Sequence, residues 1–143
     1  MGLDMFYNKT ATIFNRSFNT ETDEEKYYPT ILENVNLVET RGANISKSGL
    51  DSADAATLFV DLDNMEKPYL DPKAWAALTD EEKCNYITFN PSEDFFVKGS
   101  CTGATIPESG LYEWMRNHFD AVYKVTHIDR YDDILPHLEV GGV

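Results

Sequence analysis

Residues 86–99 read Tyr-Ile-Thr-Phe-Asn-Pro-Ser-Glu-Asp-Phe-Phe-Val-Lys-Gly. Two runs of β-branched and aromatic residues, 86–89 and 95–99, flank the turn sequence of residues 90–94. Such runs on either side of Asn, Pro, Ser and Asp are typical of two strands joined by a tight connection. This stretch therefore predicts a β-hairpin.

Similar short runs follow at intervals along the chain, at residues 11–16, 31–38, 57–62, 122–129 and 138–141. Leu58, Val60 and Leu62 alternate with more polar positions, so one face of that strand is aliphatic. Residues 30–40 are apolar on both faces, which predicts a long, partly buried strand with a bulge. We expect a mainly β fold, a small β-barrel or sandwich of about six or seven strands with one or two short helices and a long mobile loop.

Two helix signals lie close together before the predicted hairpin. Pro72 follows an acidic N-cap residue and opens a short helix in which Trp75 is expected to fill the core. Thr79 and Glu82 match a capping box, which predicts a further helical turn. These residues are interpreted as scaffold.

A longer helix is predicted after residue 104. Thr105 and Glu108 match a second capping box, and the helical pattern continues to about Phe119. Its apolar stripe contains Leu111, Trp114, Met115 and His118.

Length and composition indicate one folded domain, residues 1–143. Hydrophobic residues make up 42% of the chain, enough for a core. The 25 acidic residues against 12 basic ones give a formal charge of −13, which disfavours binding to nucleic-acid phosphates. The acidic surface either keeps the protein soluble or is one that DNA passes without sticking.

Signals for catalysis or metal binding are weak. The chain has no nucleophile elbow, P-loop or dinucleotide-binding glycine motif, and Cys84 and Cys101 lack zinc-site spacing. His127 and His137 could face each other across a terminal hairpin and form a metal triad with Asp129 or Glu139, but so few histidines make this improbable. We predict no catalytic residue, no cofactor, no metal, no disulfide and no membrane span.

Residues 41–55 are rich in Gly, Ser, Ala and Asp and show no periodicity that would bury a face. A loop of this length in a compact domain is usually functional or disordered. We therefore interpret it as a long mobile loop and a candidate partner-binding arm, with a loop of no function as the alternative. The candidate binding residues are Arg41, Asn44, Lys47, Leu50, Asp51 and Asp54.

Several segments, taken in order, carry a resemblance that covers nearly the whole chain. They are residues 8–16 and 32–42, the stretch 50–62, residues 69–75, the Asp-containing turn and apolar strand 93–99, and residues 123–141. Together they resemble the small head-closure and minor structural proteins of tailed phages and prophages of Gram-positive bacteria. The turn reads Glu93-Asp94 where Gly-Asp is commoner in that family.

The resemblance implies a virion structural protein without an active site, acting in head completion or head-tail joining. Its partners would be portal, connector and tail proteins and copies of itself in a ring, with DNA at most passing through the channel. It implies synthesis in the host bacterial cytoplasm and a place in the assembled virion.

Three other classes stay open at this point. An acidic DNA mimic, or another phage-encoded protein-binding inhibitor, would carry acids spaced along one surface like phosphates and would bind a basic partner. An uncharacterised enzyme and a free-standing ligand-binding barrel are less well supported by the residues.

Overall fold

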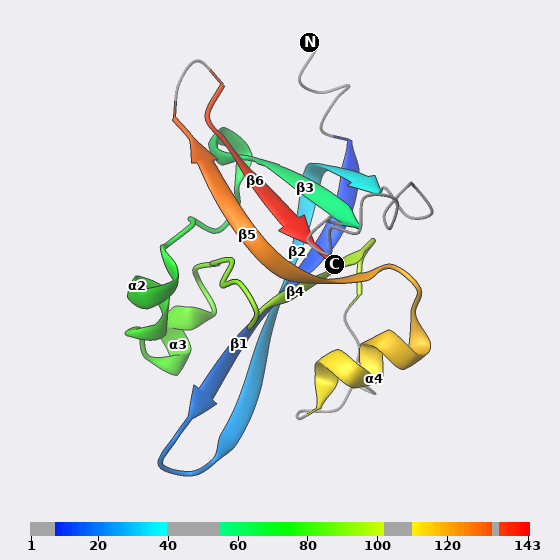
Figure 1. Ribbon diagram of the computed structural model, residues 1–143. Helices are drawn as coiled ribbons and strands as arrows, with labels where there is room; N and C mark the ends of the chain where they lie inside the picture. Colours follow the sequence, from blue (N-terminus) through cyan, green and yellow to red (C-terminus); the bar gives the residue numbers. More distant parts are fainter. Residues whose placement is uncertain (1–7, 40–54, 102–109, 133–134) are drawn as a thin grey trace.

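Six antiparallel strands form one closed barrel in a computed structural model that describes residues 8–39, 55–101, 110–132 and 135–143 (Figure 1). The order around the barrel is β1-β2-β3-β6-β5-β4. The mainly β prediction is confirmed, and the sheet closes on itself as a barrel. The strands are β1 (Lys9–Asn19), β2 (Glu24–Glu39), β3 (Ala56–Asp61), β4 (Phe95–Lys98), β5 (Val122–Tyr131) and β6 (His137–Gly142).

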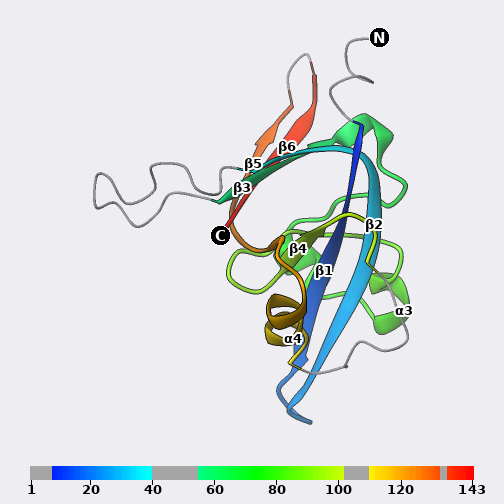
Figure 2. The same ribbon diagram turned by 90° about the vertical axis from the view of Figure 1, so that its right-hand side faces the viewer.

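Short helices flank the lower part of the β1–β2 hairpin. Helices α2 (Pro72–Ala76) and α3 (Asp80–Lys83) lie on one side of it and α4 (Leu111–His118) on the other (Figures 1 and 2). A 3₁₀ turn, η1 (Leu62–Asn64), follows β3 directly. The described residues contain one α-helix more than expected, because the Pro72 and Thr79 signals start two separate helices.

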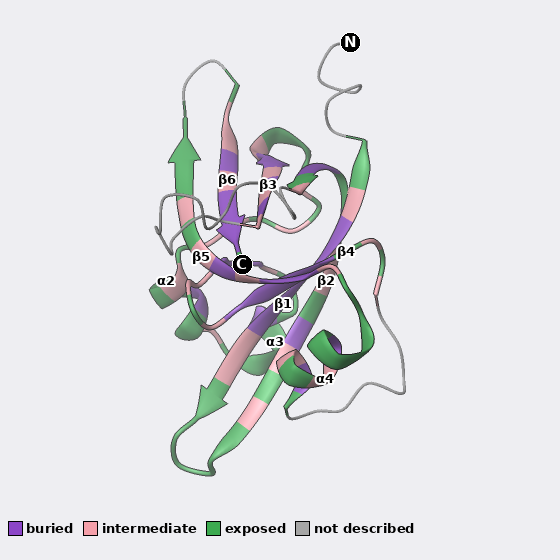
Figure 3. Ribbon diagram, turned by 45° about the vertical axis from the view of Figure 1, so that its right-hand side comes forward, coloured by how far each residue is buried: buried purple, intermediate pink, exposed green. Residues whose placement is uncertain are grey.

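Buried residues, purple in Figure 3, recur along the strands. Their side chains fill the interior of the barrel. Inward-facing aliphatic residues of β3 and β6 meet there, as the alternation in residues 57–62 predicts. The buried residues of this core are Ala11, Ile13, Leu32, Val35, Leu37, Ala56, Leu58, Val60, Ile87, Phe89, Phe96, Tyr123, Val125, Leu138 and Val140.

A second apolar cluster lies between the outer face of the sheet and α4. Phe14 and Phe95 stack with ring centroids 4.7 Å apart, and Leu111 and Met115 of α4 pack in the same cluster. Phe96 points to the other face, into the barrel. Strand β4 is thus buried on both faces, which explains its unbroken Phe-Phe-Val run.

Residues 86–89 do not form the strand predicted for them, so the hairpin interpretation of residues 86–99 was wrong. In the described part of the chain, β4 pairs with β1 on one side and β5 on the other, which leaves residues 86–89 no place beside it. Ile87 instead makes one parallel bridge to Tyr69. The side chains of Ile87 and Phe89 enter the barrel core. Burial of these side chains therefore accounts for the apolar pattern, without sheet pairing.

The β1–β2 hairpin is long and contains the predicted bulge. The register shifts between Lys9 and Ala11, which pair with Val35 and Leu32, so β2 holds one extra residue there. Asn34, within the bulge, has a φ of 60°. The turn at the other end is closed by Asn19, whose Oδ1 accepts from the backbone N–H of Glu21 at 2.9 Å.

In the described residues, the helix predicted after residue 104 ends at His118, close to the predicted end at about Phe119. Helix α4 begins at Leu111, behind Gly110 at a φ of 65°. The capping-box residues Thr105 and Glu108 lie outside the described part of the chain. No helix in that part has the length and apolar character that crossing a membrane requires.

Candidate protein-binding groove

All six candidate residues of the predicted partner-binding arm lie outside the described part of the chain, so the structure neither supports nor opposes that prediction. They are Arg41, Asn44, Lys47, Leu50, Asp51 and Asp54. A candidate site among the described residues must therefore come from the barrel and its flanking helices.

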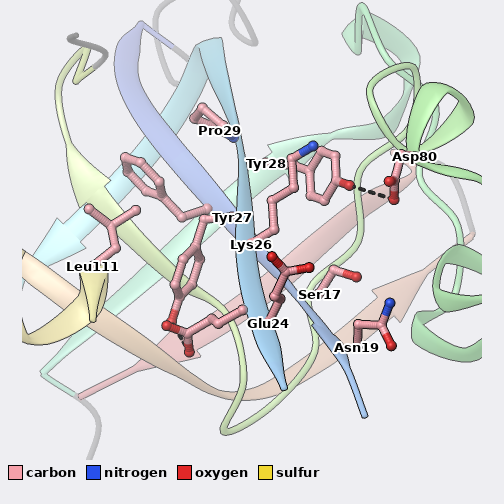
Figure 4. A pocket seen from close by; sticks show the side chains of 11 residues that line it. Ser17, Asn19, Glu24, Lys26, Tyr27, Tyr28, Pro29, Asp80 and Leu111 are labelled. Atoms are coloured by element: carbon pink, nitrogen blue, oxygen red, sulfur yellow. Dashed lines mark hydrogen bonds between the residues drawn. The ribbon is translucent and has the colours of Figure 1, made fainter. Parts of the chain in front are cut away.

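A groove of about 480 Å³ runs along residues 24–29 of β2, where the β1–β2 hairpin extends between the two sets of helices (Figure 4). Tyr27 and Leu111 lie on one side of the strand, and Tyr28 and Asp80 lie on the other. The lining residues are Phe14, Ser17, Asn19, Glu24, Glu25, Lys26, Tyr27, Tyr28, Pro29, Asp80 and Leu111.

The register shows which backbone groups of β2 face this groove. Arg16 and Tyr27 are directly opposite each other, yet the Arg16 N–H donates away from β2, to Asp94 Oδ1 at 2.8 Å. The two residues therefore form a non-hydrogen-bonded pair, and the polar backbone groups of Tyr27 point away from β1. By alternation, those of Glu25 and Pro29 do the same.

This edge is open in the described part of the chain, where β2 pairs with β3 only over residues 35–39. It presents the N–H groups of Glu25 and Tyr27 and the carbonyls of Glu25, Tyr27 and Pro29. Because the missing N–H of Pro29 falls on this edge, proline costs no bond to β1. Further along β2, residues 30–35 face residues 60–67 across a narrow crevice, and Lys67 Nζ donates to Thr30 Oγ1 at 3.2 Å.

Two tyrosines anchor the strand to the helices and the sheet. The Tyr27 ring meets Phe95 edge-on, with centroids 5.5 Å apart. The Tyr28 ring meets Trp75 of α2 edge-on at 5.6 Å, and its hydroxyl donates to Asp80 Oδ1 at 2.9 Å. Burial raises the pKa of both phenols, and nearby carboxylates add to the shift, so both stay protonated at neutral pH.

Charge in the groove is mainly acidic. Glu24, Glu25 and Asp80 line it, against the single cation Lys26 among its lining residues. Partial burial opposes ionisation of Glu25, but hydrogen bonds from Arg16 Nε at 2.6 Å and from the Gly110 N–H at 3.0 Å lower its pKa. Glu25 is therefore a charged, fixed part of the wall.

Asp94 fixes the backbone on the far side of β1. Its Oδ1 accepts from the Arg16 N–H, and its Oδ2 accepts from the Asn90 N–H at 2.8 Å and from Asn15 Nδ2 at 2.9 Å. Burial raises its pKa to about 6, although these three hydrogen bonds act in the opposite direction. Both oxygens bind protein donors, so this carboxylate holds the turn in place and is not presented to a substrate.

The histidines do not form the metal triad considered from the sequence. In the β5–β6 register, His127 pairs with Gly141 and His137 pairs with Tyr131, so the two imidazoles do not face each other. His137 bonds Leu135 O and Glu139 at 2.8 and 2.9 Å. In the described residues no group of three His, Cys, Asp or Glu side chains is placed to hold a metal ion, and Cys84 and Cys101 are free thiols.

Sequence reasoning found the helices at the groove but missed the groove itself. The strand predicted at residues 30–40 begins after the Tyr27-Tyr28-Pro29 run, whereas β2 already contains it. Two adjacent tyrosines followed by proline in an alternating segment were the available signal, because proline in a strand indicates an edge.

Comparison with known proteins gives a family and no further relative. No curated protein and no solved structure matches the chain. The model of DUF6751, described as a family of unknown function, matches residues 6–143. Because that match covers nearly the whole chain, the protein belongs to the DUF6751 family.

Proposed function

We propose that this protein is a virion structural protein of a tailed phage or prophage, acting by protein–protein contact in head completion or head-tail joining. The observation that carries the proposal is the filled barrel. Phe96, Phe89 and Leu58 in its interior are 0% exposed, so function is assigned to the outer surface. The segment-by-segment resemblance to head-closure proteins supplies the specific role.

The outer surface offers a suitable contact site. The groove combines an open strand edge with ordered aromatic and acidic side chains, which are the features of a peptide or protein contact. In this role the partners are portal, connector and tail proteins or neighbouring copies in a ring. The acidic surface lets DNA pass through the channel without adhering.

The arrangement of acids favours this role over DNA mimicry. Several carboxylates are paired with basic side chains, as in Glu25 with Arg16, Glu39 with Lys98 and Asp132 with Arg130. Paired carboxylates present less negative potential to a DNA-binding partner than a row of phosphates does. The DNA-mimic role stays the second candidate.

Deletion of the gene from a lysogen that carries it tests the proposal. Induced cells should accumulate DNA-filled heads that are not joined to tails, visible by electron microscopy, and a plasmid copy should restore joining. Normal infectious particles from the deletion strain, with the protein absent from purified wild-type virions by mass spectrometry, would contradict it.

The predicted arm is tested in the same system. If residues 43–54 form a partner-binding arm, a plasmid copy lacking them should fail to restore joining although the barrel folds. Full restoration by this variant would show that the arm is dispensable.

A further inference from the structure

We infer that the groove binds an extended segment of a partner protein in which basic and apolar residues alternate, and that this segment adds to β2 as an antiparallel strand. The inference rests on the proposed function only in treating the groove as a protein-contact site. It follows from the backbone groups, the side chains and the charge of the groove, taken in turn.

The backbone of β2 supplies the pairing groups. Glu25 and Tyr27 direct both N–H and C=O away from β1, and Pro29 directs its C=O the same way. On the side away from β1, no described strand pairs with residues 24–29 of β2. An added strand would satisfy these groups without displacing any hydrogen bond of the barrel.

The two faces of the groove differ in chemistry. Side chains of a strand alternate between faces, so an added strand places every second side chain beside Tyr27 and Leu111 and the others beside Tyr28 and Asp80 (Figure 4). The first face is mainly apolar, because it adjoins the Phe14–Phe95 cluster, and its acid, Glu25, is already bound by Arg16 and by the Gly110 N–H.

The second face is acidic. Glu24, Lys26 and Tyr28 alternate along it, and Asp80 opens α3, whose first turn also contains Glu81 and Glu82. These acids outnumber Lys26, so a basic side chain on that face gains charge complementarity. A second copy of this chain, with a formal charge of −13, is a poorer occupant.

The probe is the peptide acetyl-Lys-Val-Lys-Val-Lys-Val-amide, added to the ¹⁵N-labelled full chain at low salt. Binding should shift the amide signals of Glu25 and Tyr27 and slow their hydrogen exchange. A peptide of the same composition with its three lysines grouped together, and one with Glu in place of Lys, should bind about tenfold more weakly or worse, because neither matches both faces.

Backbone methylation separates strand addition from charge attraction. In an antiparallel pair, residues directly opposite each other have their side chains on the same face, so the valines lie opposite Tyr27 and the other residues of its face. Tyr27 directs its polar backbone groups toward the added strand. The valine N–H groups therefore point to β2, and the lysine N–H groups point away from it. Methylation of the valine nitrogens should weaken binding about tenfold or more, and methylation of the lysine nitrogens should leave it nearly unchanged. Equal effects of the two methylated peptides would overturn the inference.

Protein variants test the charge of the second face. Glu24→Gln and Asp80→Asn should each weaken binding about two- to fivefold, while Asp120→Asn, at an exposed position that does not line the groove, should have no effect. Equal weakening by all three would overturn the assignment of the acidic face.

Two further outcomes bear on the occupant. Absence of any peptide binding overturns the inference. Hydrogen-exchange protection of the Glu25 and Tyr27 amides that rises with protein concentration, without peptide, also overturns it, because a second copy of the chain would then cover the edge. Failure here with head-tail joining still dependent on the protein would leave the proposed function standing. Peptide binding by a protein that is absent from virions would support the inference and contradict the proposed function.

Discussion

Asp94 is a buried carboxylate that connects β1 to the turn before β4. Its oxygens bind the Arg16 and Asn90 N–H groups and the Asn15 amide, so Asp94→Asn leaves one of these donors without an acceptor. The substitution should lower the free energy of unfolding by about 1–3 kcal/mol at neutral pH, measured by urea denaturation. A neutral effect would show that the turn does not depend on this carboxylate.

The raised pKa of Asp94 also gives a pH dependence. Burial raises that pKa from 3.8 to about 6, so between these values the folded state holds a proton that the unfolded state has lost. Stability contributed by the residue therefore falls as pH rises through this window. Relative to Asp94→Asn, the wild type should lose about 2 kcal/mol from about pH 4 to about pH 7. An NMR titration of the Asp94 carboxyl with a midpoint near 4 would contradict this.

Gly142 lies where β6 passes closest to two aromatic residues. A Cβ built on it would stand 2.8 Å from Tyr123 Cβ and 2.9 Å from Phe96 Cζ. Gly142→Ala should lower the free energy of unfolding by about 1–3 kcal/mol in thermal or urea unfolding. Phe96→Leu should not relieve the loss, because Tyr123 Cβ is fixed by the backbone of β5; full relief in the double variant would contradict this account.

At the scale of elements, Lys83 joins α2 to α3. Its amine is buried, donates to Leu78 O at 2.8 Å and lies 5.3 Å from the centre of the Trp75 ring. Lys83→Met leaves that carbonyl without its donor and should destabilise the two helices by about 1–3 kcal/mol. Hydrogen exchange should accelerate in residues 72–84, whereas Lys73→Met, at an exposed position of α2, should have little effect.

The elements that local sequence predicted well are those that local interactions determine. The Thr79 capping box forms as the sequence predicts, and Trp75 is buried with 2% of its surface exposed. The strand of residues 57–62 was evident because its alternation matches one buried face. Residues 86–89 were assigned wrongly because apolar side chains enter a core from an irregular segment as well as from a strand.

The groove could not be predicted from the sequence, for a different reason. The edge of β2 at the groove is open because β3 pairs with β2 only from Val35 onward. The extent of that pairing depends on how far two strands that are distant in sequence overlap. Alternation predicts which side chains share a face, and it leaves strand order and overlap undetermined. Asp80 and Leu111 reach the groove from separate helices for the same reason.

At the scale of the whole molecule, the formal charge of −13 opposes compaction. Added salt screens this repulsion over distances beyond roughly 10 Å, while the close pairs such as Arg16–Glu25 are screened less. Raising NaCl from about 20 to about 300 mM at neutral pH should therefore raise the Tm. A fall in Tm would show that attractive pairs contribute more than the net repulsion.

The strand order has a consequence for synthesis of the chain. Strand β3 leaves the ribosome well before one of its two neighbours, β6, which is separated from it by β4, β5 and the helices. Until then, the nascent protein holds an incomplete sheet whose Leu58 and Val60 lack the covering they obtain from Leu138 and Val140. Closure of the barrel must wait until β6 has emerged, and it joins segments far apart in sequence. This topology slows folding and makes protection by chaperones valuable in this interval.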